Sequence, residues 1–145
     1  EGNGWSYRYA RRQWSLLENR GLRYFCLAEF DRAMIGKGAP VLGSQHAEQA
    51  VIDEHGQVLS YKRGGLLFAV NFNPSVSHTD YPIETEKGKY RLILDTDSPL
   101  FNGFGRIPGS LVIDTVNTGS GNTKRDAITP YLPARSALVF ERKER

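Results

Sequence analysis

The sequence predicts a mainly β protein, an antiparallel β-sandwich preceded by two short helices. Apolar residues alternate with period two from Ala39 onward, and glycine-containing turns recur at short, regular intervals. Residues 1–36 instead show the three- and four-residue spacing of amphipathic helices. A chain of 145 residues with 39% hydrophobic residues is long enough to bury a core. Its best apolar run, residues 66–70, is far shorter than the roughly 20 residues of a membrane span.

The two helices are predicted at the N-terminal end of the chain. The first runs from an N-cap at Ser6 to about Asn19, with an apolar face made by Tyr7, Ala10, Trp14 and Leu17. The second covers residues 22–35 and stops at Gly36. Their apolar faces are too wide for either helix to be stable alone, so we expect both to pack on a partner surface.

A change in the spacing of apolar residues separates these helices from the rest of the chain. The segment Gly36-Lys37-Gly38-Ala39-Pro40 reads as a linker because it is rich in glycine and contains proline. We therefore divide the chain into residues 1–36 and residues 37–145.

The second part is predicted to contain seven main strands and one short edge-like piece. The piece surrounds Tyr131, between Pro130 and Pro133. Glycine-containing turns around Gly56 and Gly64 connect the first three strands into a meander. The predicted strands are residues 50–53, 57–62, 66–72, 80–84, 89–95, 111–117 and 137–141.

Charge and cysteine content exclude several classes of protein. The formal net charge is +3, and the basic residues are mostly interleaved with acidic ones, which disfavours a nucleic-acid-binding β module. Cys26 is the only cysteine, so neither an intramolecular disulfide nor a cysteine-based zinc site is expected. The three histidines, His46, His55 and His78, lack metal-ligand spacing and are interpreted as surface residues.

One pair of carboxylates has two interpretations. Asp95 and Asp97 are two residues apart, so both would point to one face of an extended segment. Paired carboxylates perform glycoside hydrolysis, one as the acid and the other as the nucleophile or base. Aspartates before Ser98-Pro99 are also typical of a turn, where their side chains accept hydrogen bonds from backbone amides. The turn interpretation is favoured.

Other motifs give little sign of catalysis. A G-x-S-x-G nucleophile elbow is absent, and residues 36–38 lack the spacing of a phosphate-binding loop. Residues 102–106 place Phe104 and Arg106 on a loop that could contact sugar or could cover a sheet edge.

The chain resembles, over nearly its whole length, the C-terminal region of the glycogen (1,4-α-glucan) branching enzymes, in the α-amylase superfamily. Ordered matches of this kind are more specific than any single motif. They comprise residues 1–7, 9–14, 22–24 and 30–34, then Leu66-Leu67-Phe68-Ala69-Val70-Asn71-Phe72-Asn73-Pro74-Ser75, Thr79-Asp80-Tyr81, Gly88-Lys89-Tyr90, Leu94-Asp95-Thr96-Asp97, Gly103-Phe104-Gly105-Arg106 and residues 131–139.

The resemblance implies both the architecture and the activity of a larger protein. Residues 1–36 would end a (β/α)8 barrel, and residues 37–145 would form the α-amylase-type C-terminal all-β domain. Such an enzyme cleaves an α-1,4 glucan through a covalent glycosyl-enzyme intermediate and transfers the chain to a 6-hydroxyl, making an α-1,6 branch. Its catalytic carboxylates lie upstream of Glu1, so no catalytic residue is assigned here and Asp95 and Asp97 fall to the turn interpretation. The chain is therefore expected to be an inactive C-terminal fragment.

The resemblance also sets the expected partners. They are an α-glucan and the upstream barrel, with no cofactor or metal, no nucleic acid and no membrane, in the cytoplasm. Trp5 would follow the last barrel strand, where its ring could stack on glucan or could be wedged between barrel and sandwich. Without the barrel, the helices of residues 1–36 could pair in a dimer. The alternative function is a free-standing carbohydrate-binding β-sandwich.

Overall fold

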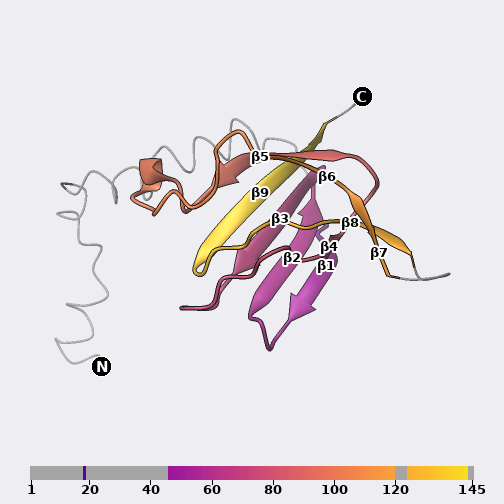
Figure 1. The fold of residues 1–145 in the computed structure, drawn as a ribbon, viewed down its shortest axis with the longest axis horizontal. Coiled ribbons are helices and arrows are strands. Elements are labelled where there is room, and N and C mark those ends of the chain that lie inside the picture. The colour runs from indigo at the N-terminus through magenta and orange to yellow at the C-terminus, as the bar shows by residue number, and fades with distance from the viewer. Residues whose placement is uncertain (1–17, 19–45, 120–123, 144–145) are drawn as a thin grey trace, which may run out of the picture.

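The computed structural model describes residue 18, residues 46–119 and residues 124–143 (Figure 1). Apart from Glu18, the predicted helices over residues 6–19 and 22–35 lie outside the described residues, as do Trp5 and Cys26. The helices and the boundary at residue 36 therefore stay predictions. No helix among the described residues is long and apolar enough to cross a membrane.

The larger of two sheets contains six strands, and every neighbouring pair is antiparallel. Consecutive strands β1, β2 and β3 form the meander predicted from the sequence, and the C-terminal strand β9 lies between β3 and β5 (Figure 1). In order across the sheet, the strands are β1 (Glu48–Asp53), β2 (Val58–Arg63), β3 (Leu66–Asn71), β9 (Ser136–Lys143), β5 (Lys89–Asp95) and β6 (Val112–Asp114).

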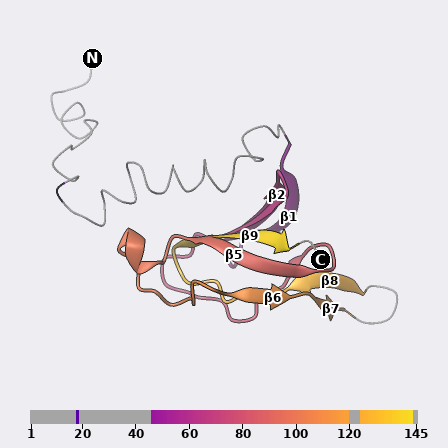
Figure 2. The same ribbon diagram turned by 90° about the horizontal axis from the view of Figure 1, so that it is seen from above.

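The smaller sheet contains three short antiparallel strands. Their order is β4 (Ile83–Glu84), β8 (Arg125–Ile128) and β7 (Val116–Thr118). Figure 2 shows β7 and β8 on one side of β5 and β9. The predicted fold class is confirmed at the level of a mainly β chain built from antiparallel sheets.

The main hydrophobic core combines side chains from both sheets. Leu67 and Phe140 of the larger sheet belong to one buried cluster with Ile83 and Ile128 of the smaller sheet. Each of these four side chains is at most 1% exposed. Burial of this apolar surface favours keeping the two sheets together, at about 25 cal/mol for each Å² removed from water. The other fully enclosed members include Ala69, Leu132 and Leu138.

A second buried cluster lies on the opposite face of the six-stranded sheet. Leu66 and Phe68 of β3 alternate with Leu67, so they point away from the main core, and Val139 of β9 joins them. Phe101, from the short 3₁₀ helix η2 (Pro99–Phe101), packs on the same cluster. Since β3 contributes to two clusters, its sequence is a continuous apolar run rather than an alternating one.

The predicted turns between the first three strands are confirmed. Gly64 and Gly65 both have positive φ, 56° and 78°, which suits a two-residue hairpin loop. In the preceding hairpin, the Asp53 carboxylate accepts a hydrogen bond from the Gly56 amide at 2.8 Å.

The strand predicted over residues 111–117 is wrong as one element. It divides into β6 and β7, which belong to different sheets. The interruption is Thr115, whose amide donates to the Gly88 carbonyl and whose hydroxyl accepts from the Gly88 amide, both at 3.0 Å. These bonds replace a strand ladder at the point where the chain passes between sheets.

The predicted strand over residues 80–84 is too long. Pro82 has no amide to donate and Asp80 has a φ of 50°, so regular pairing begins only at Ile83. Strand β8 was not predicted. The edge-like piece around Tyr131 is present as a single bridge between His78 and Leu132, but Leu132 is fully buried rather than at an exposed edge.

Candidate functional site

The first candidate site is the loop that follows β5, over residues 95–106. The Asp95 carboxylate accepts a hydrogen bond from the Asp97 amide at 2.7 Å, which closes a tight turn. Asp95 and Asp97 are only 8% and 5% exposed. These contacts confirm the turn interpretation of the carboxylate pair.

Asp97 fixes the far end of the loop through Arg106. The Arg106 Nη2 and Nε atoms donate to the two Asp97 carboxylate oxygens at 2.8 and 3.0 Å. The amides of Phe104 and Arg106 donate to the same carboxylate at 3.3 and 2.9 Å. A bidentate pair reinforced by backbone amides is a rigid connection, because it fixes direction as well as distance. Arg106 also donates to the Ala134 carbonyl at 3.1 Å, which ties the loop to the segment before β9.

The folded structure shifts the pKa values of Asp95 and Asp97 in opposite directions. Burial raises the pKa of Asp95, and the nearby negative charge of Asp97 adds to that effect. Burial also acts to raise the pKa of Asp97, but the hydrogen bonds from the Arg106 side chain and from backbone amides outweigh it, so the pKa of Asp97 is lowered. Asp97 is therefore held ionised as the acceptor that organises the loop, and both of its oxygens are already occupied.

Glycines at two positions allow the loop to close on itself. A Cβ on Gly103 would clash with the Asp97 carbonyl oxygen, which belongs to the backbone and cannot rotate away. Gly105 has a φ of 65°, and its amide donates to the Asp97 carbonyl at 2.7 Å. Between them, this compact loop carries Phe104 on its outside.

Phe104 is the most exposed large hydrophobic side chain among the described residues, at 78%. The Arg106 guanidinium carbon lies 5.2 Å from the centre of its ring, within the range of a cation–π contact. The loop therefore joins a buried ionic anchor to an exposed aromatic ring.

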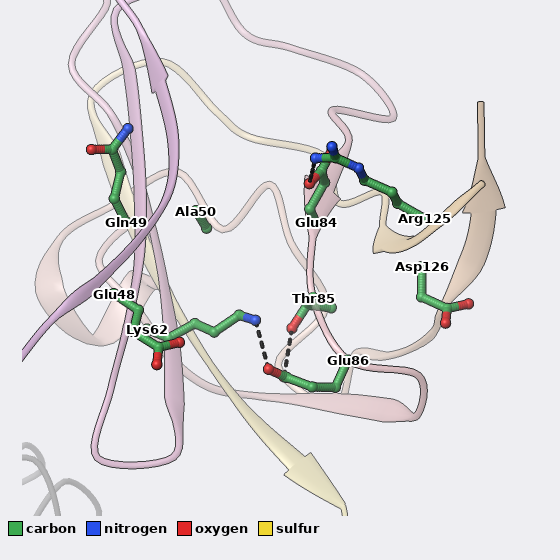
Figure 3. A pocket seen from close by; sticks show the side chains of 9 residues that line it. All are labelled: Glu48, Gln49, Ala50, Lys62, Glu84, Thr85, Glu86, Arg125 and Asp126. Atoms are coloured by element: carbon green, nitrogen blue, oxygen red, sulfur yellow. Dashed lines mark hydrogen bonds and ion pairs between the residues drawn. The ribbon is translucent and has the colours of Figure 1, made fainter. Parts of the chain in front are cut away.

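The second candidate site is the polar pocket in Figure 3, with a volume of about 340 Å³. It lies where strands β1 and β2 of the larger sheet meet β4 and β8 of the smaller one. None of its lining side chains is aromatic. They are Glu48, Gln49, Ala50, Lys62, Glu84, Thr85, Glu86, Arg125 and Asp126.

Two ion pairs line this pocket. Lys62 contacts Glu86 at 2.7 Å, and Arg125 contacts Glu84 at 2.6 Å (Figure 3). The hydrogen bond from Lys62 is the main cause that lowers the pKa of Glu86 to about 2. A carboxylate with so low a pKa is not a proton donor near neutral pH. Glu86 therefore contributes negative charge and hydrogen-bond acceptors to the pocket and is not a proton donor there.

The histidines are placed in different surroundings. His46 and His55 are exposed, as expected for surface residues, whereas His78 is half-buried. The ring of His78 forms a hydrogen bond with the Gly56 carbonyl at 3.1 Å. Within the described ranges, no group of three His, Cys, Asp or Glu side chains is arranged to hold a metal ion.

A cluster around Tyr81 was missed in the sequence. The Tyr81 hydroxyl donates to the Asp53 carboxylate at 2.9 Å, and its ring lies 5.2 Å from that of His78. Burial, followed by the bond to Asp53, raises the pKa of Tyr81 to about 12. Gly56 indicated the turn, but nothing in the sequence linked Asp53 to a tyrosine 28 positions away.

Comparison with known proteins identifies the family. Residues 50–143 match the family described as alpha amylase, C-terminal all-beta domain. The chain belongs to this family. The match includes nearly all of both sheets and the whole loop of residues 95–106.

The curated proteins that are similar to this chain include branching enzymes. The chain is 42% identical to the 1,4-alpha-glucan-branching enzyme of Yarrowia lipolytica over 99% of its own length and 21% of that protein. Identity is 38% to the branching enzyme of Debaryomyces hansenii, over 100% of this chain and 22% of the relative. Identity is 42% to the branching enzyme of Emericella nidulans, over 99% of this chain and 21% of the relative. The chain thus spans about a fifth of the length of the curated relatives it matches.

Proposed function

We propose that this chain is the C-terminal part of a 1,4-α-glucan-branching enzyme of glycogen synthesis. The observation that carries the proposal is identity of 38–42% to such enzymes over essentially the whole chain. Similarity that continues outside residues 50–143 favours this specific parent over a general all-β module, because the family match covers only those residues.

In this proposal the described residues support the reaction and do not perform it. Retaining glycoside chemistry needs two free carboxyl groups about 5–5.5 Å apart, one of them able to donate a proton. The Asp97 carboxylate is instead fully engaged by Arg106 and backbone amides, and Glu86 is held ionised by Lys62. The carboxylates that cleave the α-1,4 bond and transfer the chain to a 6-hydroxyl would belong to the barrel, and the chain alone would be inactive.

The remaining parts of the proposal concern placement and partners. The two sheets would form the sandwich, with residues 1–36 as the helical end of the barrel and Trp5 near bound glucan. The parent would act on α-glucan in the cytoplasm. Without its barrel, the chain would dimerise through the apolar faces of residues 1–36.

The direct test is an exchange experiment in a relative. The matching segment of the Yarrowia lipolytica enzyme is replaced by this chain, and α-1,6 linkages formed from amylose are counted after enzymatic debranching. We expect the chimera to branch amylose and this chain alone to form no branches. A folded chimera without activity, or branching by the chain alone, would contradict the proposal.

The sequence upstream of Glu1 in the gene separates this proposal from a free-standing carbohydrate-binding sandwich. A barrel-encoding sequence is expected there. Its absence would favour the free-standing module.

A further inference from the structure

From the geometry of the loop at residues 95–106, we propose a glucan-binding subsite in which Phe104 stacks on a pyranose ring. The subsite rests on the proposed function, which supplies the class of ligand, an α-1,4-linked glucan. It adds a contact on the all-β domain itself, away from any reacting bond.

The Phe104 ring is unusually exposed for a large apolar side chain. Burying a phenylalanine side chain is favourable, so one that is 78% exposed leaves a large apolar surface in water. The other exposed apolar side chain of this loop, Leu100, is 54% exposed. Two such side chains are a small patch compared with the roughly 800 Å² that each partner buries in a standard protein–protein interface. The patch therefore fits a small ligand better than a protein surface.

Hydrogen bonds hold the backbone that carries the Phe104 ring. The Phe104 amide donates to Asp97, the neighbouring Gly105 amide donates to the Asp97 carbonyl, and the Arg106 guanidinium contacts the ring. The fixed backbone and the contact with Arg106 restrict the ring, so less conformational freedom is lost when a ligand binds. Rigid presentation of an exposed aromatic ring is what a stacking platform requires.

Polar residues flank Phe104 in the chain, which suits a sugar ligand. A glucose ring presents a face of C–H groups surrounded by hydroxyls, so it is matched by an apolar ring with polar groups around it. Asn102 and Arg106 are exposed on either side of Phe104 in the chain. Asn102 has left-handed backbone geometry with a φ of 65°, at the end of η2. Its side-chain amide can both donate to and accept from sugar hydroxyls.

A hollow lies next to the loop, although Phe104 itself does not line it. A depression of about 480 Å³ lies between β5 and the loop, and Gly105, the residue after Phe104, lines it. Leu100 and Ile107 line it as well, so the hollow has an apolar side. The depression gives a glucan chain that binds at this loop a second surface besides Phe104.

The polar pocket of Figure 3 is the competing location, and its chemistry is less suitable. Its lining contains no aromatic side chain, and its cations Lys62 and Arg125 are paired with Glu86 and Glu84. A neutral sugar would have to disrupt those ion pairs to gain comparable hydrogen bonds. We therefore place the subsite at Phe104.

The test is affinity electrophoresis of the 145-residue chain in native gels containing glycogen, with isothermal titration of maltoheptaose as a second readout. We expect glycogen to retard the unaltered chain. Phe104→Ala should weaken binding roughly tenfold, the equivalent of one lost aromatic contact. Phe104→Trp should preserve binding because a flat ring remains.

A matched control is Phe72→Ala, since Phe72 is also an exposed phenylalanine, at 62%, but lies after β3 outside the loop. Its binding should equal that of the unaltered chain. Thermal unfolding of each variant shows whether the fold is kept. A folded Phe104→Ala chain that binds glycogen like the unaltered chain would overturn the subsite, as would an unaltered chain that is not retarded at all.

Two further outcomes would also overturn it: equal loss of binding in Phe72→Ala, or a change of sedimentation in Phe104→Ala with glucan binding kept, which would indicate a protein contact. The branching assay of the chimera tests the proposed function separately. An active chimera with unchanged glycogen binding in Phe104→Ala would reject the subsite alone.

Discussion

The loop at residues 95–106 and the pocket of Figure 3 both contain ion pairs of similar length, 2.8 Å for Asp97–Arg106 and 2.7 Å for Lys62–Glu86. Burial distinguishes them. The Asp97 side chain is 4% exposed, whereas the Glu86 side chain is 55% exposed. A buried carboxylate that loses a hydrogen-bond partner costs free energy because water cannot reach it, whereas water replaces the lost partner of an exposed carboxylate. Contact distance alone therefore does not tell which pair organises the structure.

The largest effect is expected from Asp97→Ala. This change leaves the Arg106 side chain and two backbone amides without their buried acceptor, and losing these hydrogen bonds to a charged group costs about 3 kcal/mol. Urea denaturation measures the free energy of unfolding. The matched variant Glu86→Ala should lose less than about 1 kcal/mol. Equal losses in the two variants would remove the distinction between the regions.

Gly103→Ala tests the close packing of the loop. The added methyl group would meet the Asp97 backbone, so we expect a loss of about 2 kcal/mol in the free energy of unfolding. Gly109→Ala is the control, because nothing lies within 4 Å of its added methyl group. That variant should stay within about 0.5 kcal/mol of the unaltered chain. A Gly103→Ala protein as stable as Gly109→Ala would show that the loop is not closely packed.

Acid denaturation provides a smaller test of the same comparison. Because the folded state lowers the pKa of Asp97 below its ordinary value of 3.8, its contribution to stability is present above that pH and is lost as the pH falls below it. Asp97→Asn has no such titration. The stability difference between the unaltered chain and Asp97→Asn should therefore be constant above about pH 5 and shrink in stronger acid. A difference that grows as the pH falls would contradict the lowered pKa.

The smallest effect is expected from Lys62→Ala at the exposed pair. Surface ion pairs contribute about 0–1 kcal/mol, and salt screens them because the Debye length is about 3 Å at 1 M. Thermal unfolding of Lys62→Ala and the unaltered chain should differ less at 1 M salt than at low salt. A large difference that persists at 1 M salt would show that this pair stabilises the fold in the same way as Asp97–Arg106.

Much of the fold could be predicted because its signals are local. Strand β5 was predicted with its observed limits, 89–95, since alternation and bordering turns both mark it. Strand β8 was missed because only Ala127 and Ile128 are buried while its first residue is the exposed Arg125. The passage of residues 111–117 between sheets depends on two hydrogen bonds between Thr115 and Gly88, and such distant pairing leaves no local pattern.

The loop could be predicted only in part. The spacing of Asp95 and Asp97 before Ser98-Pro99 indicated a turn, and that prediction is confirmed. The bidentate contact of Asp97 with Arg106, nine residues later, follows from the closed path of the loop rather than from spacing. The pocket of Figure 3 could not be predicted, since it joins side chains of β1 and β2 to those of β4 and β8.

Asp95→Asn in the Yarrowia lipolytica chimera tests most directly whether the carboxylate of Asp95 is structural or catalytic. Asparagine keeps a side-chain oxygen to accept the Asp97 amide but removes the acid whose pKa is raised by burial. The measurement is kcat for α-1,6 branch formation on amylose. We predict that kcat stays within about twofold of the chimera with Asp95, whereas loss of a catalytic acid or base lowers rates by about 10²-fold or more. A fall of that size in a folded variant would contradict the assignment of Asp95 to the turn alone.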